Sequence, residues 1–173
     1  MRKIVTADAE DGLKTLPAGI TDTCVTSPPY YGLRDYGIDG QIGREESPDV
    51  YIERLVAVFR DVRRVLRDDG TLWVVIGDSY AGSNKGVGTS KAKEVYIPDR
   101  DSPQCNMRKT WSGIKAKNLI GIPWALAFAL RGDGWFLRQD IIWHKKNGIP
   151  ESVTDRCTKC HEYIFLLSKS ARY

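Results

Sequence analysis

Hydrophobic and polar positions along the chain predict short buried strands separated by amphipathic helices. The clearest helix spans residues 47–67, where apolar side chains recur every three or four positions and arginines fill much of the other side. Ser47 and Pro48 suit the N-cap and first turn of this helix, and Gly70 is a natural stop. A second helix is predicted over residues 122–131. The arginine-rich side is interpreted as a solvated helix face.

Runs of apolar and β-branched residues predict the strands of one sheet. These runs lie at residues 3–7, 22–26, 71–76, 135–144 and 162–168. The third run is nearly all apolar, as expected of a strand covered on both faces. Strands that alternate with helices indicate an α/β fold, and the last two strands, with no helix between them, favour antiparallel pairing. We predict a single domain with helices on both faces of the sheet and an antiparallel C-terminal strand.

Composition and cysteine content narrow the class of protein. No apolar run approaches the ~20 residues that a membrane helix needs. Acidic residues follow the N-terminus too closely for a secretory signal. The four cysteines, in a chain without such a signal, are interpreted as reduced thiols in the cytoplasm. These observations predict a cytoplasmic protein that does not contact a membrane.

Positive charge is concentrated in one segment. Residues 81–117 hold eight basic and three acidic residues, a balance of +5 in a chain whose net charge is +4, so the rest sums to −1. Frequent Gly, Ser and Pro argue against regular structure in this segment. A solvated loop and a phosphate-contacting insertion are both compatible with this pattern.

Residues 27–30, the Ser-Pro-Pro-Tyr turn, directly follow a predicted strand, where open α/β sheets place their ligands. Two consecutive prolines restrict the backbone to few conformations. The Ser27 side chain and the Pro28 carbonyl could then accept hydrogen bonds from an –NH₂ group and leave its lone pair aimed at an electrophile. Tyr30 offers a flat face on which a base could stack. Direct attack by the amine requires no general base of high pKa.

This turn and an ordered series of later motifs resemble the amino-methylating DNA methyltransferases, whose catalytic tetrapeptide is Asp/Asn/Ser-Pro-Pro-Tyr/Phe. The matching motifs lie at residues 72–80, 121–124, 134–135, 140–143, 150–156 and 161–163. Their order is that of the β-type group, in which the catalytic motif precedes the cofactor motif. Methyltransferases that act on protein glutamine or on RNA place a glycine-rich loop first, and residues 1–25 contain none.

The resemblance implies a partial Rossmann-like methyltransferase sheet and methyl transfer from S-adenosylmethionine to an exocyclic amino group. The substrate would be a base flipped out of double-stranded DNA, as in restriction–modification systems. Ser27 and Pro28 would orient the amine, Pro29 would make the turn rigid, and Tyr30 would stack on the base. A serine at the first position favours cytosine N4 over adenine N6. Asp8 matches a family position near the cofactor adenine and is the one cofactor contact expected.

Within this family the basic segment is expected to contact DNA, through Lys85, Arg108, Lys109 and Trp111. The family's Phe-x-Gly-x-Gly cofactor loop has no counterpart in the chain. We therefore expect an incomplete catalytic domain with weak or no activity alone. A second chain or a C-terminal segment would complete the cofactor pocket. The alternative is a catalytically silent DNA-binding remnant or subunit.

Two further features admit more than one interpretation. Cys157, Cys160 and His161 fit a haem-attachment pattern, but haem attachment requires export and zinc requires four ligands. Ordinary structural roles are preferred for them, and no metal site is predicted. Asp78, at a strand end, is either a loop-capping carboxylate or part of the target-base pocket, with the pocket slightly preferred.

Overall fold

The computed structural model describes residues 4–81, 114–148 and 150–173, which form three helices and four strands. In chain order these are α1 (Ala9–Lys14), β1 (Thr21–Thr26), α2 (Pro48–Val65), β2 (Leu66–Ile76), α3 (Ile122–Gly132), β3 (Phe136–His144) and β4 (His161–Ser168). The expected DNA contacts Lys85, Arg108, Lys109 and Trp111 lie outside the described residues. The bounds of α2 and α3 confirm the helices predicted at 47–67 and 122–131, with small changes at their ends.

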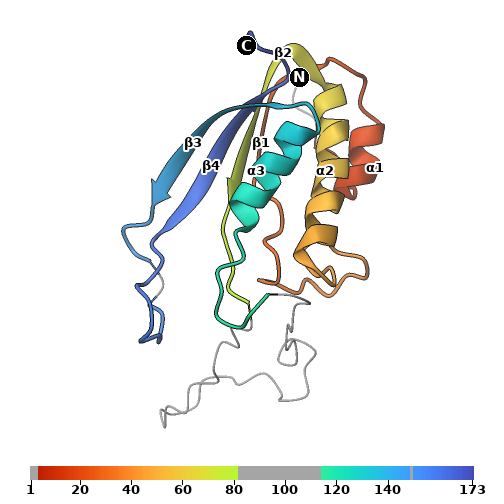
Figure 1. Ribbon diagram of the computed structural model, residues 1–173. Coiled ribbons are helices and arrows are strands. Elements are labelled where there is room, and N and C mark those ends of the chain that lie inside the picture. The colour runs from red at the N-terminus through yellow and green to blue at the C-terminus, as the bar shows by residue number, and fades with distance from the viewer. Residues whose placement is uncertain (1–3, 82–113, 149) are drawn as a thin grey trace.

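The four strands form one mixed sheet in the order β1-β2-β4-β3. β1 and β2 are parallel neighbours, whereas β4 runs antiparallel to both β2 and β3 (Figure 1). This arrangement confirms the predicted α/β class and the antiparallel C-terminal strand. Among the described strands, β1 and β3 are the edges of the sheet.

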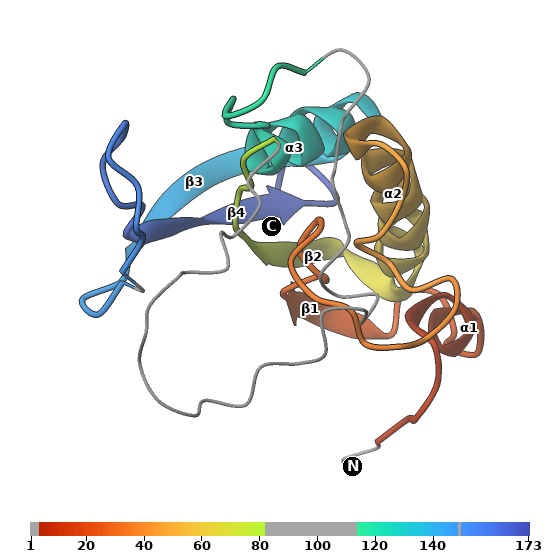
Figure 2. The same ribbon diagram turned by 90° about the horizontal axis from the view of Figure 1, so that it is seen from below.

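The hydrophobic core lies between one face of the sheet and the helices. Leu72, Val74 and Ile76 alternate along β2 toward the helices and are buried. α2 and α3 cover this face, and α1 packs against α2 beside β1 (Figure 2). Helices were predicted on both faces, but the three described helices all lie on one. The opposite face leaves Val25 70% and Trp143 47% exposed.

The boundary between α2 and β2 differs from the prediction. Ser47 caps α2 as expected, and its side chain accepts a hydrogen bond from the Val50 backbone N–H. The helix ends at Val65, however, and Leu66 is already extended and paired with Thr21. The cause is long-range, because Gly19 and Ile20 donate hydrogen bonds to the last carbonyls of α2 at Arg64 and Val65.

The predicted strand at residues 3–7 is wrong for its described part, residues 4–7. Ile4 is 94% exposed, and no described strand pairs with this segment. A single β-rich run gains nothing from extended geometry unless a neighbouring strand accepts its hydrogen bonds. The chain instead turns into α1, which Asp8 caps by accepting a hydrogen bond from Glu10 N–H at 2.9 Å.

Candidate active site

Three strand ends meet at the carboxyl edge of the parallel pair. The Ser-Pro-Pro-Tyr turn, residues 27–30, follows β1, and Gly77 follows β2. β4 begins at this same edge because Tyr163 pairs with Ile76. Glu162 is therefore brought beside the turn, although the two are distant in sequence.

Side chains from α2 and from the segment after β2 form hydrogen bonds with the backbone of the turn and of the residue after it. Tyr51 of α2 is fully buried, and its hydroxyl donates a hydrogen bond to the Pro29 carbonyl at 2.8 Å. The Tyr51 ring also packs against Tyr31, with ring centroids 5.2 Å apart. Burial raises the pKa of the Tyr51 phenol, so this group remains a hydrogen-bond donor. Ser79, after β2, donates to the Tyr31 carbonyl at 3.0 Å. The C-terminal end of the turn is thus anchored by α2 and by the segment that follows β2.

Tyr30 lies in a narrow space between two other strand ends. A Cβ atom on Gly77 would stand 2.8 Å from Cε2 of Tyr30, so the ring contacts the backbone of residue 77 closely. The Tyr30 hydroxyl donates to Oε2 of Glu162 at 2.9 Å, and Ser27 Oγ lies 3.4 Å from the same hydroxyl. Burial is the main cause that raises the pKa of Tyr30 to about 12. The hydrogen bond with Ser27 lowers this pKa, and the hydrogen bond and charge of Glu162 raise it.

Positive side chains surround the Glu162 carboxylate. Lys145 Nζ lies 3.3 Å from Oε2 of Glu162 and also stands over the Trp143 ring. Half-buried Lys159 is close enough for its charge to interact with Glu162, and burial lowers the pKa of its ammonium. The site therefore holds charges of both signs: Glu162 contacts Lys145, and Lys159 also interacts with the carboxylates of Asp78 and Glu151.

Asp78 caps the loop after β2 and the start of α3. Its side chain accepts hydrogen bonds from the backbone N–H groups of Ser79 at 2.9 Å, Gly121 at 3.0 Å and Ile122 at 3.0 Å. Gly121, the N-cap of α3, has no side chain with which to cap its own helix. Asp78 supplies that cap from the end of β2. The capping interpretation is confirmed, and the slight preference for a target-base role stays a prediction.

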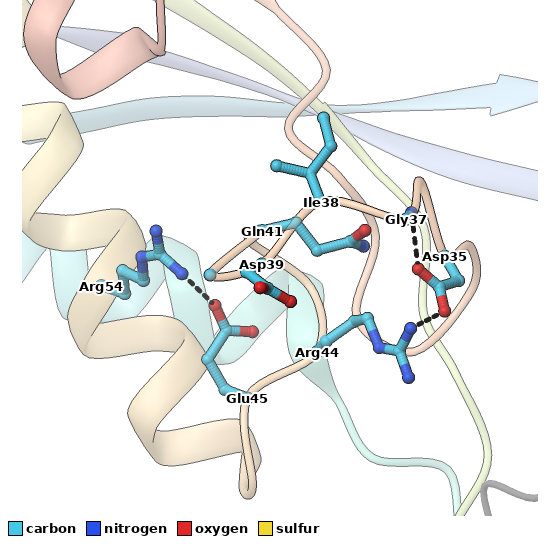
Figure 3. Close-up of a pocket in the computed structure, with 9 residues that line it drawn as sticks. Asp35, Gly37, Ile38, Asp39, Gln41, Arg44, Glu45 and Arg54 are labelled. Atoms are coloured by element: carbon cyan, nitrogen blue, oxygen red, sulfur yellow. Dashed lines mark hydrogen bonds and ion pairs between the residues drawn. The ribbon is translucent and has the colours of Figure 1, made fainter. Parts of the chain in front are cut away.

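A cavity of about 480 Å³ lies in the loop between β1 and α2 (Figure 3). Arg44 forms an ion pair with Asp35, and Nη1 of Arg54 in α2 lies 3.4 Å from Oε1 of Glu45. Since both arginines already have carboxylate partners, the cavity offers little unbalanced charge to an anion. Its loop has a structural role for the turn, because a Cβ atom on Gly43 would lie 3.0 Å from the Tyr30 carbonyl oxygen.

The sequence-predicted site residues fall into three groups. Ser27, Pro28, Pro29 and Tyr30 lie together at the carboxyl edge, as expected of a turn after β1. Asp8 is exposed at the N-cap of α1, where its carboxylate bonds the helix backbone. The four expected DNA contacts lie in the segment that the structure does not describe.

Sequence reasoning missed the partners of the turn. Tyr51 occupies one of the periodic apolar positions of the helix predicted at 47–67, and nothing in the sequence marks its hydroxyl as a separate signal. Glu162 appeared within a family-like motif but received no role. The available signal is the position of Glu162 as the second residue of β4, which places this charged side chain at the end of the sheet where the turn lies.

Among residues 4–81, 114–148 and 150–173, no group of three or more His, Cys, Asp or Glu side chains could hold a metal ion. Within the same part of the chain, no helix is long and apolar enough to cross a membrane.

An α/β sheet that carries a Ser-Pro-Pro-Tyr turn at the carboxyl edge of its parallel strands has the arrangement of an amino-group methyltransferase. Comparison with known proteins identifies the family. The family model N6_N4_Mtase, described as DNA methylase, matches residues 21–173. The chain belongs to this family, which confirms the resemblance in its motif series.

Curated relatives are similar over almost all of the chain. It is 53% identical over 173 residues to the type II methyltransferase M.SmaI of Serratia marcescens, covering 99% of the chain and 57% of the relative. It is 52% identical over 169 residues to M.Cfr9I of Citrobacter freundii, covering 96% of the chain and 54% of the relative. The chain thus spans about half the length of these relatives.

Solved structures share the fold. A putative DNA modification methylase of Thermus thermophilus, complexed with S-adenosyl-L-methionine, matches with a TM-score of 0.60 at 23% identity, covering 96% of the chain and 54% of that structure. PvuII DNA methyltransferase, described as cytosine-N4-specific, matches with a TM-score of 0.61 at 15% identity, covering 96% and 48% respectively. At these identities the likeness shows the fold alone.

Proposed function

We propose that the chain forms the target-base side of an S-adenosylmethionine-dependent DNA methyltransferase. It would methylate the exocyclic amino group of a base flipped from double-stranded DNA. The observation that carries the proposal is the Ser-Pro-Pro-Tyr turn at the carboxyl edge of β1. Tyr51 already occupies the Pro29 carbonyl, which leaves the Pro28 carbonyl and Ser27 Oγ as the acceptors for an amine.

In this mechanism the residues of the turn position the amine and do not remove its proton first. Two N–H bonds donate to Ser27 Oγ and the Pro28 carbonyl, so the nitrogen lone pair points away from the turn. S-adenosylmethionine, when bound, supplies an electrophilic methyl group on a positively charged sulfur. The nitrogen would form a bond to that methyl group as the bond between the methyl group and sulfur breaks, and the excess proton would then leave to solvent. Tyr30 holds the base by stacking.

We favour cytosine N4 over adenine N6 as the methylated atom, because the first position of the turn is Ser27. Within the family resemblance, serine is more typical of cytosine N4 methylation and aspartate of adenine N6. The relatives named type II methyltransferases support a place in restriction–modification, in the cytoplasm. Lys85, Arg108, Lys109 and Trp111 remain the proposed DNA contacts.

We propose that a second chain or a C-terminal segment completes the S-adenosylmethionine pocket. Ligands of open α/β sheets bind in a crevice at the carboxyl ends of parallel strands. Among the described strands the one parallel pair is β1 and β2, and β1 is an edge strand with Val25 70% exposed. The residues present therefore fit the methyl-accepting side of the pocket, with Asp8 as the proposed cofactor contact. The half-length match to the relatives supports the same proposal.

The test is methyl transfer from labelled S-adenosylmethionine to mixed-sequence duplex DNA, with product nucleosides identified by mass. The chain is assayed alone and with the remaining segment of M.SmaI, joined or added separately. We expect N4-methylcytosine with the added segment and little product without it. Ser27→Ala should lower transfer by at least about tenfold, since the amine loses one acceptor. N6-methyladenine would correct the base assignment, and DNA binding without any product would favour the silent subunit.

A further inference from the structure

We propose that Glu162 is a positioning residue of the candidate active site, acting through Tyr30 to keep Ser27 Oγ free to accept the target amine. The inference rests on the proposed function and adds a residue to it. A serine hydroxyl carries one hydrogen and two lone pairs, so it can either donate or accept toward a neighbour. Because an amine must be received by an acceptor, the hydrogen of Ser27 has to point elsewhere.

The structure provides a chain of acceptors for that hydrogen. Ser27 Oγ donates to the Tyr30 hydroxyl oxygen at 3.4 Å, and the Tyr30 hydroxyl donates to Oε2 of Glu162 at 2.9 Å. An ionised carboxylate can only accept, so the direction of the second bond is fixed by Glu162. The first bond is long for two oxygens. The bond to Glu162 is therefore the one that sets the orientation of the phenol, and the Ser27 hydrogen follows it.

Glu162 is itself held by a cation. Lys145, which directly follows β3, lies 3.3 Å from the same Oε2 atom that accepts from Tyr30. A carboxylate with an ammonium partner and a phenol partner is fixed on two sides. The acceptor chain thus joins the turn after β1 to the ends of β3 and β4.

The hydrogen bond between Tyr30 and Glu162 also helps to fix the position of the Tyr30 ring, together with Gly77. The Tyr30 ring contacts the backbone of Gly77 on one side, where even a Cβ atom would lie only 2.8 Å from Cε2. With its hydroxyl bonded to Glu162, the ring is constrained at its edge and at its tip. A ring so constrained presents one fixed face for stacking on a base.

The kinetic test is a double-mutant cycle on the form of the protein that transfers methyl groups. Glu162→Gln keeps the shape but removes the charge of the acceptor, and it should lower kcat by about tenfold, as for a lost hydrogen bond to a charged group. KM for DNA should change little. Tyr30→Phe retains the stacking ring and removes the link, so adding Glu162→Gln to it should cost nothing further. Independent, multiplicative losses would overturn the proposal.

A spectroscopic test needs no activity. With tyrosine labelled at ¹³Cζ, the Tyr30 resonance is assigned from its loss in Tyr30→Phe. Donation to a carboxylate moves this resonance downfield, so Glu162→Gln and Glu162→Ala should both move it upfield at neutral pH. Glu53→Gln, an exposed change on α2, should leave it in place. An unmoved Tyr30 resonance in both Glu162 variants would overturn the proposal. Absent methyl transfer by the completed wild type would overturn the proposed function instead.

Discussion

Single residues in the turn, and Tyr31 directly after it, are distinguished by which of their polar atoms are already bonded. The Pro29 carbonyl accepts from Tyr51, and the Tyr31 carbonyl accepts from Ser79. Ser27 is exposed, and its side-chain contact is the long one to Tyr30. The bonded groups make the backbone rigid, while the less engaged ones remain available to a substrate. Preorganisation of this kind is what a reaction that depends on amine orientation requires.

Gly77→Ala should impair methyl transfer without unfolding the protein. The added methyl group would lie 2.8 Å from the Tyr30 ring, so the ring has to leave its position. We expect at least about a tenfold loss of kcat, because misplacing the ring proposed to stack on the base by even ~1 Å is costly. The control is Gly132→Ala, where nothing lies within 4 Å of the added Cβ. Equal activities of the two variants, at similar thermal midpoints, would contradict the proposed place of Tyr30.

The place of the turn at the carboxyl edge of β1 could be predicted from sequence, but its partners could not. Ser27 to Tyr30 are consecutive, so their acceptors and aromatic face are visible in the local pattern. Glu162 lies 132 positions from Tyr30, and the contact depends on β4 inserting between β2 and β3. Tyr51 occupies an apolar helix position, and only the packing reveals that its hydroxyl reaches Pro29.

Secondary-structure elements followed their local patterns wherever tertiary pairing agreed with them. α2, with its Ser47 cap, is fixed by an 18-residue amphipathic segment. Residues 4–7 have a strand-like composition but no described neighbour, and Leu66 leaves the helix because Thr21 pairs with it. Both differences arise from long-range hydrogen bonding, which a window of neighbouring residues does not contain.

Asp78→Ala should destabilise α3 and the loop before it. Three backbone N–H groups would lose their shared acceptor, and Gly121 offers no side chain to replace it. We expect the free energy of unfolding in urea to fall by about 2 kcal/mol. Asp78→Asn, which keeps one acceptor oxygen, should lose less. Ser47→Ala, which removes the single-bond cap of α2, should cost about 1 kcal/mol. If Asp78→Ala were no more costly than Ser47→Ala, the capping role would be refuted.

At the scale of the whole molecule, the described chain has one covered and one open sheet face. The family and the α/β class were predictable because the motif series and the strand–helix order extend over most of the sequence. Covering helices on the second face were also predicted, and the three described helices do not supply them. A sheet that is buried on both faces needs apolar side chains of other elements packed against each face. Exposed Val25 and Trp143 on the open face would gain from burial by the proposed completing segment.

The uneven charge of the molecule predicts how DNA binding should depend on salt. Residues 81–117 carry +5 while the remainder sums to −1, so phosphate contacts are expected from this segment. Replacing Lys85, Arg108 and Lys109 together with alanine should reduce the slope of log Kobs against log salt by about 3, near 0.9 per lost contact. Fluorescence anisotropy with a duplex, between about 50 and 200 mM salt, measures this slope.

Two comparisons separate specific phosphate contacts from other effects in that experiment. Trp111→Ala should weaken binding at every salt concentration and leave the slope unchanged, because stacking releases no counterions. Arg60→Ala removes a cation that already pairs with Asp133 through bonds of 2.8 and 2.6 Å, so it should leave the slope unchanged. A slope that falls by the same amount per removed charge in the triple variant and in Arg60→Ala would mean that net charge alone drives binding. The segment at 81–117 would then be a solvated loop, and the DNA surface would have to lie elsewhere on the molecule.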